Sequence, residues 1–243
     1  MGSSSEAILR PYEKDCTLVI MAKAPKPGRV KTRLAQGLPT AVVTALYRCL
    51  LDDTIALAQS LRTVEIAIMC PASDINDLAC LAGEAVSVVA QSGEGLAAGL
   101  TSVFEHFAAS GRQRVIAFNS DSPHLPASIL ENAFEALATC DVVVGPTHDG
   151  GYYLVGARAS HPGLFEGDGM GKSNALEALL ARIQSLGLSA QFADPFYDID
   201  VASDLIRLDE ELRVAPARSP RTAAWLAEWR QVLTQLQSDR VDL

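Results

Sequence analysis

The chain has 243 residues, of which 49% are hydrophobic, and its 20 lysines and arginines stand against 29 aspartates and glutamates. This length and composition can bury one substantial core, which excludes a disulfide-stapled miniprotein and a disordered chain. The formal net charge of −9 provides no global positive field for nucleic acid or an anionic membrane, so any anion site must be local.

The cysteines and the N-terminal residues favour a cytoplasmic protein. The five cysteines are scattered and lack CxxC spacing, which is typical of reduced thiols. Residues 1–15 are predicted to form a flexible tail without a secretory signal, and no apolar run reaches the roughly 18 residues needed to cross a bilayer.

After this tail, short β-rich runs alternate with longer helical periods. Strands are predicted over 17–22, 64–70, 86–90, 115–118, 141–145 and 152–155. Helices are predicted over 39–61, 73–81, 96–107, 127–138, 172–186, 201–212 and 225–236. The alternation predicts βαβ units and a mainly parallel sheet in a single α/β domain over 16–216, with 217–243 as a C-terminal helix packed on it. Ligands of such sheets bind beyond the carboxyl ends of the strands.

A basic loop over 23–34 follows the first predicted strand. It concentrates Lys26, Arg29, Lys31 and Arg33 in an otherwise acidic chain, and its prolines and Gly28 forbid regular helix. A solvated basic loop is the alternative, but the position at a strand end favours phosphate binding. As surface cations, Lys31 and Arg33 are expected to contribute little to folding.

Two acidic segments are candidates for metal binding. Asp121 follows the strand 115–118 and is able to offer a hard oxygen ligand to Mg²⁺, although a turn or helix cap is the alternative. Asp198 and Asp200 point to the same side if their segment is extended, and would complete the site opposite Asp121. Asp200 has a helix cap as its alternative role. These aspartates make chemical sense as a metal site only if they converge.

The segment 145–156 contains Asp149 and the pair Gly150 and Gly151. Glycines allow a close approach to a ligand or a positive φ, whereas a hairpin with an Asp-Gly turn is the alternative. His124 and His148 lack partners at metal-ligand spacing, so both are interpreted as polar loop residues.

Taken in this order, the four segments resemble a bacterial family described as DUF2064, a radical-SAM-associated glycosyltransferase family of the nucleotide-diphospho-sugar transferase (GT-A-like) superfamily. The family pattern of AKxPxPGxVKTRL, SDxP, GPxxDGGYYLxG and a late DxD is matched within 23–34, 120–123, 145–156 and 198–200. More distantly, the chain is similar to molybdenum-cofactor and 2-phospholactate guanylyltransferases. The resemblance implies a Rossmann-like three-layer sandwich with a mainly parallel central sheet.

The resemblance also implies the site. Metal ligands for Mg²⁺ or Mn²⁺ would be Asp121, Asp200 and Asp198, and catalytic residues would be Asp121, Asp149 and Lys31. Nucleotide phosphates would be bound by Lys23, Lys26, Gly28, Arg29, Lys31, Arg33, Gly150 and Gly151. The chain departs from the family at Asn119, where glycine is usual, and in the segments 91–100 and 169–173. The substrate is therefore not carried over with the fold.

Three functions are consistent with these residues. The first is glycosyl transfer from a nucleotide-sugar to a small-molecule acceptor, with Asp149 as a base or a sugar-hydroxyl ligand. The second is nucleotidylyl transfer from a nucleoside triphosphate to a phosphorylated small molecule, which the density of cations in the basic loop suits. The third is nucleotide binding without catalysis. No nucleic-acid or membrane partner is expected.

Overall fold

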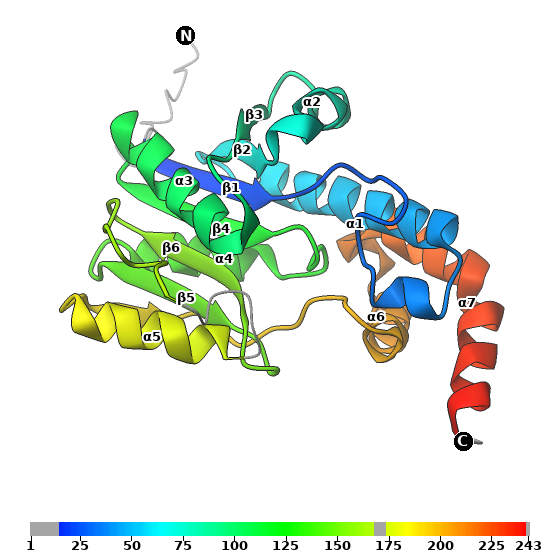
Figure 1. Cartoon of the computed structure of the whole chain (residues 1–243). Helices are drawn as coiled ribbons and strands as arrows, with labels where there is room; N and C mark the ends of the chain where they lie inside the picture. Colours follow the sequence, from blue (N-terminus) through cyan, green and yellow to red (C-terminus); the bar gives the residue numbers. More distant parts are fainter. Residues whose placement is uncertain (1–14, 168–173, 242–243) are drawn as a thin grey trace, which may run out of the picture.

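A seven-stranded sheet forms the centre of the computed structural model, which describes residues 15–167 and 174–241 (Figure 1). The strands are β1 (Cys16–Met21), β2 (Glu65–Cys70), β3 (Ser87–Ala90), β4 (Arg114–Asn119), β5 (Val142–Pro146), β6 (Tyr152–Ala157) and β7 (Ala190–Phe192). Their order in the sheet is β3-β2-β1-β4-β6-β5-β7. Only β6 runs antiparallel to its neighbours among the described strands, so the predicted mainly parallel sheet is confirmed.

Seven α-helices and three short 3₁₀ helices are described. The α-helices are α1 (Thr40–Ser60), α2 (Ile75–Ala82), α3 (Gly95–Ala109), α4 (Ala127–Ala136), α5 (Ala175–Ser185), α6 (Ala202–Val214) and α7 (Pro220–Val241). The 3₁₀ helices are η1 (Leu34–Gln36), η2 (Ala72–Asp74) and η3 (Pro216–Arg218). No helix in the described part of the chain combines the length and the hydropathy needed to span a bilayer.

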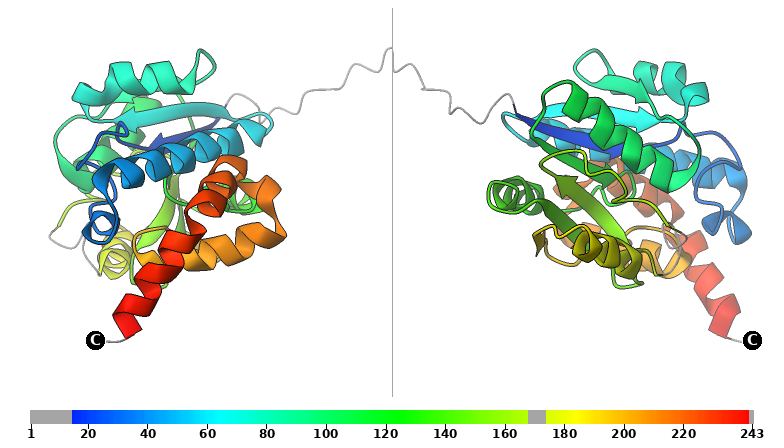
Figure 2. Two further views of the ribbon diagram at one scale, coloured as in Figure 1. Left: turned by 90° about the vertical axis from the view of Figure 1, so that its right-hand side faces the viewer. Right: turned by 60° about the vertical axis from the view of Figure 1, so that its left-hand side comes forward.

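The helices cover both faces of the sheet, as the predicted three-layer sandwich requires (Figure 2). Apolar side chains of α1, α2 and α4 pack on one face in one buried cluster. Those of α3 and α5 pack on the other face in a second cluster. A third cluster joins the outer side of α1 to α6, α7 and the η1 segment. The predicted α/β sandwich is therefore confirmed.

The sequence predictions differ from the structure at a few element ends. Pro39 has an extended conformation before α1 and does not lie in the first helical turn. The expected helix from residue 73 begins at Ile75, because η2 forms a separate tight turn first. β7 was not predicted, because its three residues are all exposed and have no alternating pattern. The expected start of α5 at Lys172, the departure over 169–173 and the tail over 1–14 lie outside the described residues.

Candidate functional site

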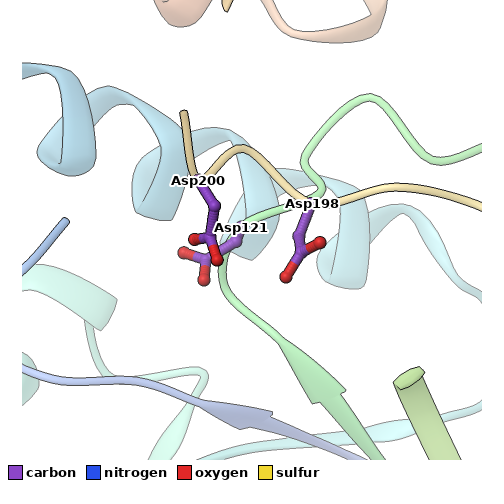
Figure 3. A group of neighbouring side chains, drawn as sticks. All are labelled: Asp121, Asp198 and Asp200. Carbon is purple, nitrogen blue, oxygen red and sulfur yellow. The ribbon is translucent and has the colours of Figure 1, made fainter. Parts of the chain in front are cut away.

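Three aspartates converge beyond the carboxyl ends of the strands. Asp121 directly follows β4, and Asp198 and Asp200 lie in the segment between β7 and α6 (Figure 3). One carboxylate oxygen of each residue lies within 4.8 Å of those of the other two. The two acidic segments thus meet at one point although they are distant in the chain.

Backbone hydrogen bonds hold the late acidic segment, residues 193–201 between β7 and α6, close to Asp121. The chain continues beyond β7 beside β5, where the Phe196 amide donates to the Pro146 carbonyl at 3.1 Å. Farther along, the Ile199 amide donates to the Asp121 carbonyl at 3.2 Å, and the Ser122 hydroxyl donates to the Tyr197 carbonyl at 2.9 Å. Because both ends of the segment are tied to strand ends, Asp198 and Asp200 are held against Asp121.

Lys31 from the basic loop occupies the centre of this cluster. Its ammonium lies 2.9 Å from Asp121 Oδ2 and 3.0 Å from Asp200 Oδ1, and its side chain is only 4% exposed. Burial by itself lowers the pKa of Lys31, but the two carboxylates outweigh burial and hold the pKa above its ordinary value. The backbone of Lys31 has a φ of 47°, which non-glycine residues rarely adopt. Lys31 is therefore a buried cation in a strained loop, not the surface cation that was expected.

The carboxylate of Asp200 does not cap α6, which was its alternative role. The Asp204 carboxylate accepts the amides of Asp200 and Val201, each at 2.8 Å, and so caps the helix itself. The Asp200 carboxylate instead contacts Lys31 and, at 3.4 Å, Arg33. It is thus left facing the site.

Asp198 differs electrostatically from its two neighbours. Burial, followed by the charges of Asp200 and Asp121, raises the pKa of Asp198 to about 6, although Lys31 opposes the shift. The Asp198 carboxyl is therefore partly buried beside two other carboxylates, and the Lys31 ammonium offsets the resulting rise in pKa only in part.

The basic loop divides into two groups of cations. Lys26 contacts Asp74 at 3.1 Å and Asp77 at 2.7 Å, and Arg29 contacts Asp74 at 3.4 Å. Lys31 and Arg33 instead face the acidic cluster, and Arg33 remains 68% exposed. The loop is therefore not the uniform cradle of cations that its sequence suggests.

The glycine pair lies in the turn of the β5–β6 hairpin. The Thr147 hydroxyl and the Gly151 amide both donate to Asp149 Oδ1, and these bonds lower the pKa of Asp149. Gly150 has a φ of +89°, whereas a Cβ on Gly151 would lie 2.9 Å from Thr147 Oγ1. The turn's own conformation and side chains thus require both glycines, and the predicted phosphate contact of the pair stays a prediction.

His124 is not the polar loop residue that was expected. Its side chain is fully buried, with its ring 4.8 Å from that of Phe196 and 4.7 Å from that of Tyr197. Burial, with Arg218 and Arg207 nearby, lowers the pKa of His124 to about 3. His124 therefore packs as a neutral ring beneath the late acidic segment. His148 is exposed.

Two residues near the site were missed by the sequence analysis. Asp74 is fully buried and accepts the Ala24 amide at 2.9 Å, which anchors the basic loop to the end of β2. Tyr47 lies on α1 and reaches both Lys23 and Ser120 with its hydroxyl. The local sequence pattern indicates a helix cap for Asp74 and core packing for Tyr47. Their place near the site is visible only from hydrogen-bond partners that are distant in the chain.

Comparisons with known proteins bear on the family resemblance and on the fold. Residues 54–172 match the family described as "Uncharacterized protein conserved in bacteria (DUF2064)", which confirms the resemblance over a span containing Asp121 and the glycine pair. A search of curated proteins finds no match.

Several solved structures share the fold. A "putative nucleotide-diphospho-sugar transferase" from Desulfovibrio desulfuricans G20 is 25% identical over 91% of this chain and 98% of that chain, with a TM-score of 0.84. A nucleotidyl transferase from Methanothermobacter thermautotroptrophicus is 18% identical over 83% and 99% of the two chains, with a TM-score of 0.56. A 4-diphosphocytidyl-2C-methyl-D-erythritol synthase from Anaerococcus prevotii DSM 20548 is 12% identical over 83% and 97%, with a TM-score of 0.55. The chain is therefore a transferase, and it has the fold of the nucleotide-diphospho-sugar transferases, as its motifs predicted.

Proposed function

We propose that the protein is a Mg²⁺- or Mn²⁺-dependent glycosyltransferase that moves a sugar from a nucleotide-sugar to a small-molecule acceptor. The observation that carries this proposal is the convergence of Asp121, Asp198 and Asp200 around Lys31 beside the basic loop. Carboxylates and cations at one sheet edge suit the binding of a metal-complexed diphosphate. The likeness to the Desulfovibrio protein supports the same class of substrate.

The residues fit a divalent cation. Oxygen ligands of an octahedral Mg²⁺ at about 2.1 Å lie at most roughly 4.2 Å apart, so the carboxylates, within 4.8 Å of one another, need to draw together by only about half an ångström. The Lys31 ammonium already stands in for a cation between two of them. Asp121, Asp198 and Asp200 would hold the metal, which when bound neutralises charge that builds on a leaving diphosphate.

The division of the basic loop favours a diphosphate over a triphosphate. Lys26 and Arg29 are neutralised by Asp74 and Asp77, away from the acidic cluster. Lys31 and Arg33 remain beside the cluster, and Lys23 is exposed and has no ion pair within the described part of the chain. Fewer cations thus face the site than the sequence density implies. Their role is to bind and orient the diphosphate and to stabilise its charge.

Asp149 fits the role of a sugar-hydroxyl ligand better than that of a base. The hydrogen bond from Thr147 is the largest cause that lowers the pKa of Asp149, with the Gly151 amide and Arg33 contributing. A carboxylate held ionised in this way binds protons weakly but accepts hydrogen bonds strongly. We therefore assign it to substrate orientation.

Nucleotidylyl transfer is the second candidate. It is favoured by the fold shared with the nucleotidyl transferase from Methanothermobacter and the 4-diphosphocytidyl-2C-methyl-D-erythritol synthase from Anaerococcus. The two reactions release different products, a nucleoside diphosphate in glycosyl transfer and pyrophosphate in nucleotidylyl transfer.

A thermal-shift panel of nucleotide-sugars and nucleoside triphosphates, each with and without Mg²⁺, tests the proposal. A ligand at a hundred times its Kd stabilises the protein by roughly 2.7 kcal/mol. We expect a metal-dependent shift with a nucleotide-sugar, and loss of that dependence in Asp121→Asn and Asp200→Asn. Asp52→Asn is the control, because Asp52 pairs with Arg48 on α1 outside the cluster.

Hits from the panel are then assayed for release of nucleoside diphosphate and of pyrophosphate. Release of a nucleoside diphosphate supports glycosyl transfer, and release of pyrophosphate supports the second candidate. If no nucleotide shifts the melting temperature with Mg²⁺, the proposed function is wrong.

A further inference from the structure

Tyr47 is a polar side chain on a helix face that otherwise packs as core. It lies on α1, is 4% exposed, and belongs to the apolar cluster between the helices and the sheet. Phenylalanine would fill the same space, so packing alone does not account for the hydroxyl. A buried hydroxyl costs free energy unless it is hydrogen-bonded, which makes its partners informative.

The Tyr47 hydroxyl lies between two loops of the candidate site. It is 3.2 Å from the Lys23 amide, at the start of the basic loop, and 3.0 Å from Ser120 Oγ, just after β4. Ser120 Oγ in turn lies 3.4 Å from Asp121 Oδ1. Because β1 and β4 are neighbours in the sheet, one phenol reaches the loops that follow both.

The chemistry at the two ends fixes the direction of this chain of hydrogen bonds. An amide N–H only donates, so the Tyr47 oxygen accepts from Lys23 and has its own proton left to donate to Ser120. A carboxylate only accepts, so the Ser120 hydroxyl donates to Asp121. Burial, reinforced by the charge of Asp121, raises the pKa of Tyr47 to about 12, so the phenol keeps its proton.

This chain of hydrogen bonds contacts one oxygen of the Asp121 carboxylate, whereas Lys31 contacts the other. Ser120 contacts Oδ1, whereas the Lys31 ammonium contacts Oδ2 at 2.9 Å. The Thr54 hydroxyl of α1 donates to the Leu50 carbonyl at 2.8 Å and also lies 3.3 Å from the Ser120 carbonyl, as a longer, shared contact. Asp121 is thus constrained at both oxygens, and α1 supplies the constraint at one of them.

We propose that Tyr47 is a positioning residue of the site, joining the start of the basic loop to the Asp121 carboxylate through Ser120. This inference rests on the proposed function, in which Asp121 is a metal ligand. Groups that orient metal ligands by hydrogen bonding typically change metal affinity about 10- to 100-fold when removed. Loss of either hydroxyl is therefore expected to weaken metal binding without removing a ligand.

The test compares Tyr47→Phe, Ser120→Ala and the double variant. Mn²⁺ affinity is measured by electron paramagnetic resonance, and exchange of the Lys23 amide proton is measured in the metal-free protein. We expect each single variant to lose about tenfold or more in Mn²⁺ affinity, and the double variant to lose no more than the larger single loss, because both break one chain. Exchange at Lys23 should be faster in Tyr47→Phe and Ser120→Ala.

Tyr153→Phe is the matched control. Tyr153 is also buried and donates one hydrogen bond, to the Asp194 carbonyl at 2.9 Å, and it forms no described hydrogen bond with Asp121 or Ser120. Its Mn²⁺ affinity and its Lys23 exchange should match the wild type. The Ala22 amide, bonded to the Met69 carbonyl, serves as an internal reference for exchange in every variant.

The outcomes separate this inference from the proposed function. If Tyr47→Phe binds Mn²⁺ as tightly as the wild type, or if the losses of the two single variants simply add, the inference is wrong. If the wild type binds no Mn²⁺, the metal proposal fails, and exchange of the Lys23 amide alone tests the hydrogen-bond chain. Unchanged protection of this amide in Ser120→Ala would then overturn the inference, and faster exchange would support it.

Discussion

At the scale of single residues, the candidate site contains buried ionisable side chains whose charge is set by burial together with their neighbours. Lys31 is charged although it is almost fully buried, because two carboxylates surround its ammonium. His124 is neutral although it lies near the acidic segment, because burial and two arginines disfavour its charged form. We therefore expect substitution of these residues to change the stability of the protein.

We expect Lys31→Gln to lower the free energy of unfolding of the metal-free protein by about 1–3 kcal/mol. The variant leaves the carboxylates of Asp121 and Asp200 facing each other without their shared cation. The loss is expected to be smaller than for a fully buried ion pair, because both carboxylates are partly exposed to solvent. Urea denaturation in a chelator measures the effect.

Arg33→Gln is the matched control for Lys31→Gln. Arg33 contacts the same Asp200 but is 68% exposed, so we expect a change within about 0.5 kcal/mol. Mn²⁺ should raise the melting temperature of Lys31→Gln more than that of the wild type, because it replaces the missing cation. Equal unfolding free energies for the two variants would show that Lys31 does not neutralise the cluster.

His124 is expected to make stability depend on pH between about 6.5 and 3. Its pKa is about 3 in the folded protein, below the ordinary value of about 6.5, so the unfolded chain binds more protons across this window. Stability is therefore lost as the pH falls, with a slope that approaches roughly 1.4 kcal/mol per pH unit. Glu211, 3.9 Å from Nε2, would favour protonation, but burial, Arg218 and Arg207 outweigh it.

His124→Phe provides the comparison, since a phenyl ring keeps the contacts with Phe196 and Tyr197. Urea unfolding from pH 7 to pH 4 should give a shallower pH dependence for the variant than for the wild type. Identical slopes would mean that His124 becomes protonated in the folded protein.

At the scale of elements, helices are attached to one another by buried carboxylates as well as by apolar contacts. Asp53 of α1 accepts the amides of Arg221 and Thr222, at 3.2 and 2.8 Å, in the first turn of α7. Asp209 of α6 contacts Arg230 of α7 at 2.8 Å. The C-terminal helix is thus fixed near its start by α1 and farther along by α6.

We expect Asp53→Ala to reduce the free energy of unfolding by about 2–3 kcal/mol. The variant removes two charge-assisted hydrogen bonds and the only side-chain cap described for the start of α7. Asp52→Ala is the adjacent control, because the partly buried Asp52 contacts only the side chains of Arg48 and Arg221 and accepts no described backbone amide, so we expect a change in stability below about 1 kcal/mol. Equal losses would assign no special role to the cap.

At the scale of the whole molecule, the site depends on three clusters of buried side chains. The first two clusters pack helices on the two faces of the sheet. The third cluster packs α7 against the η1 segment and the late acidic segment. Tyr197 and Ile199, which flank Asp198, belong to this third cluster together with Trp225 and Leu226. Figure 2 shows α6 and α7 on the outer side of α1.

We expect Leu226→Ala to destabilise the whole protein by about 2–4 kcal/mol, because Leu226 is fully buried in the third cluster. Both tryptophans, Trp225 and Trp229, lie on α7, so tryptophan fluorescence reports on this helix while circular dichroism reports on all elements. The two signals should change at the same urea concentration in the wild type and the variant. Earlier loss of fluorescence would show that α7 unfolds as a separate unit.

The alternation of strands and helices, and with it the mainly parallel sheet, followed from the sequence alone. Apolar period and the position of glycine and proline are local properties, so most elements were predicted within a few residues. The motif residues Asp121 and Asp200 were also identified as candidates, because strand ends in such sheets face the ligand side. What these residues contact was not available from local pattern.

Tertiary structure decided the partners of the charged side chains. It placed Lys31 between Asp121 and Asp200, withdrew Lys26 and Arg29 to Asp74, and linked Tyr47 to Asp121. The exposed strand β7 that guides Asp198 and Asp200 to the site also has no local signature. The physical reason is that ion pairs and hydrogen bonds between residues far apart in the chain depend on how the elements pack, whereas helices and strands leave a period in the sequence itself.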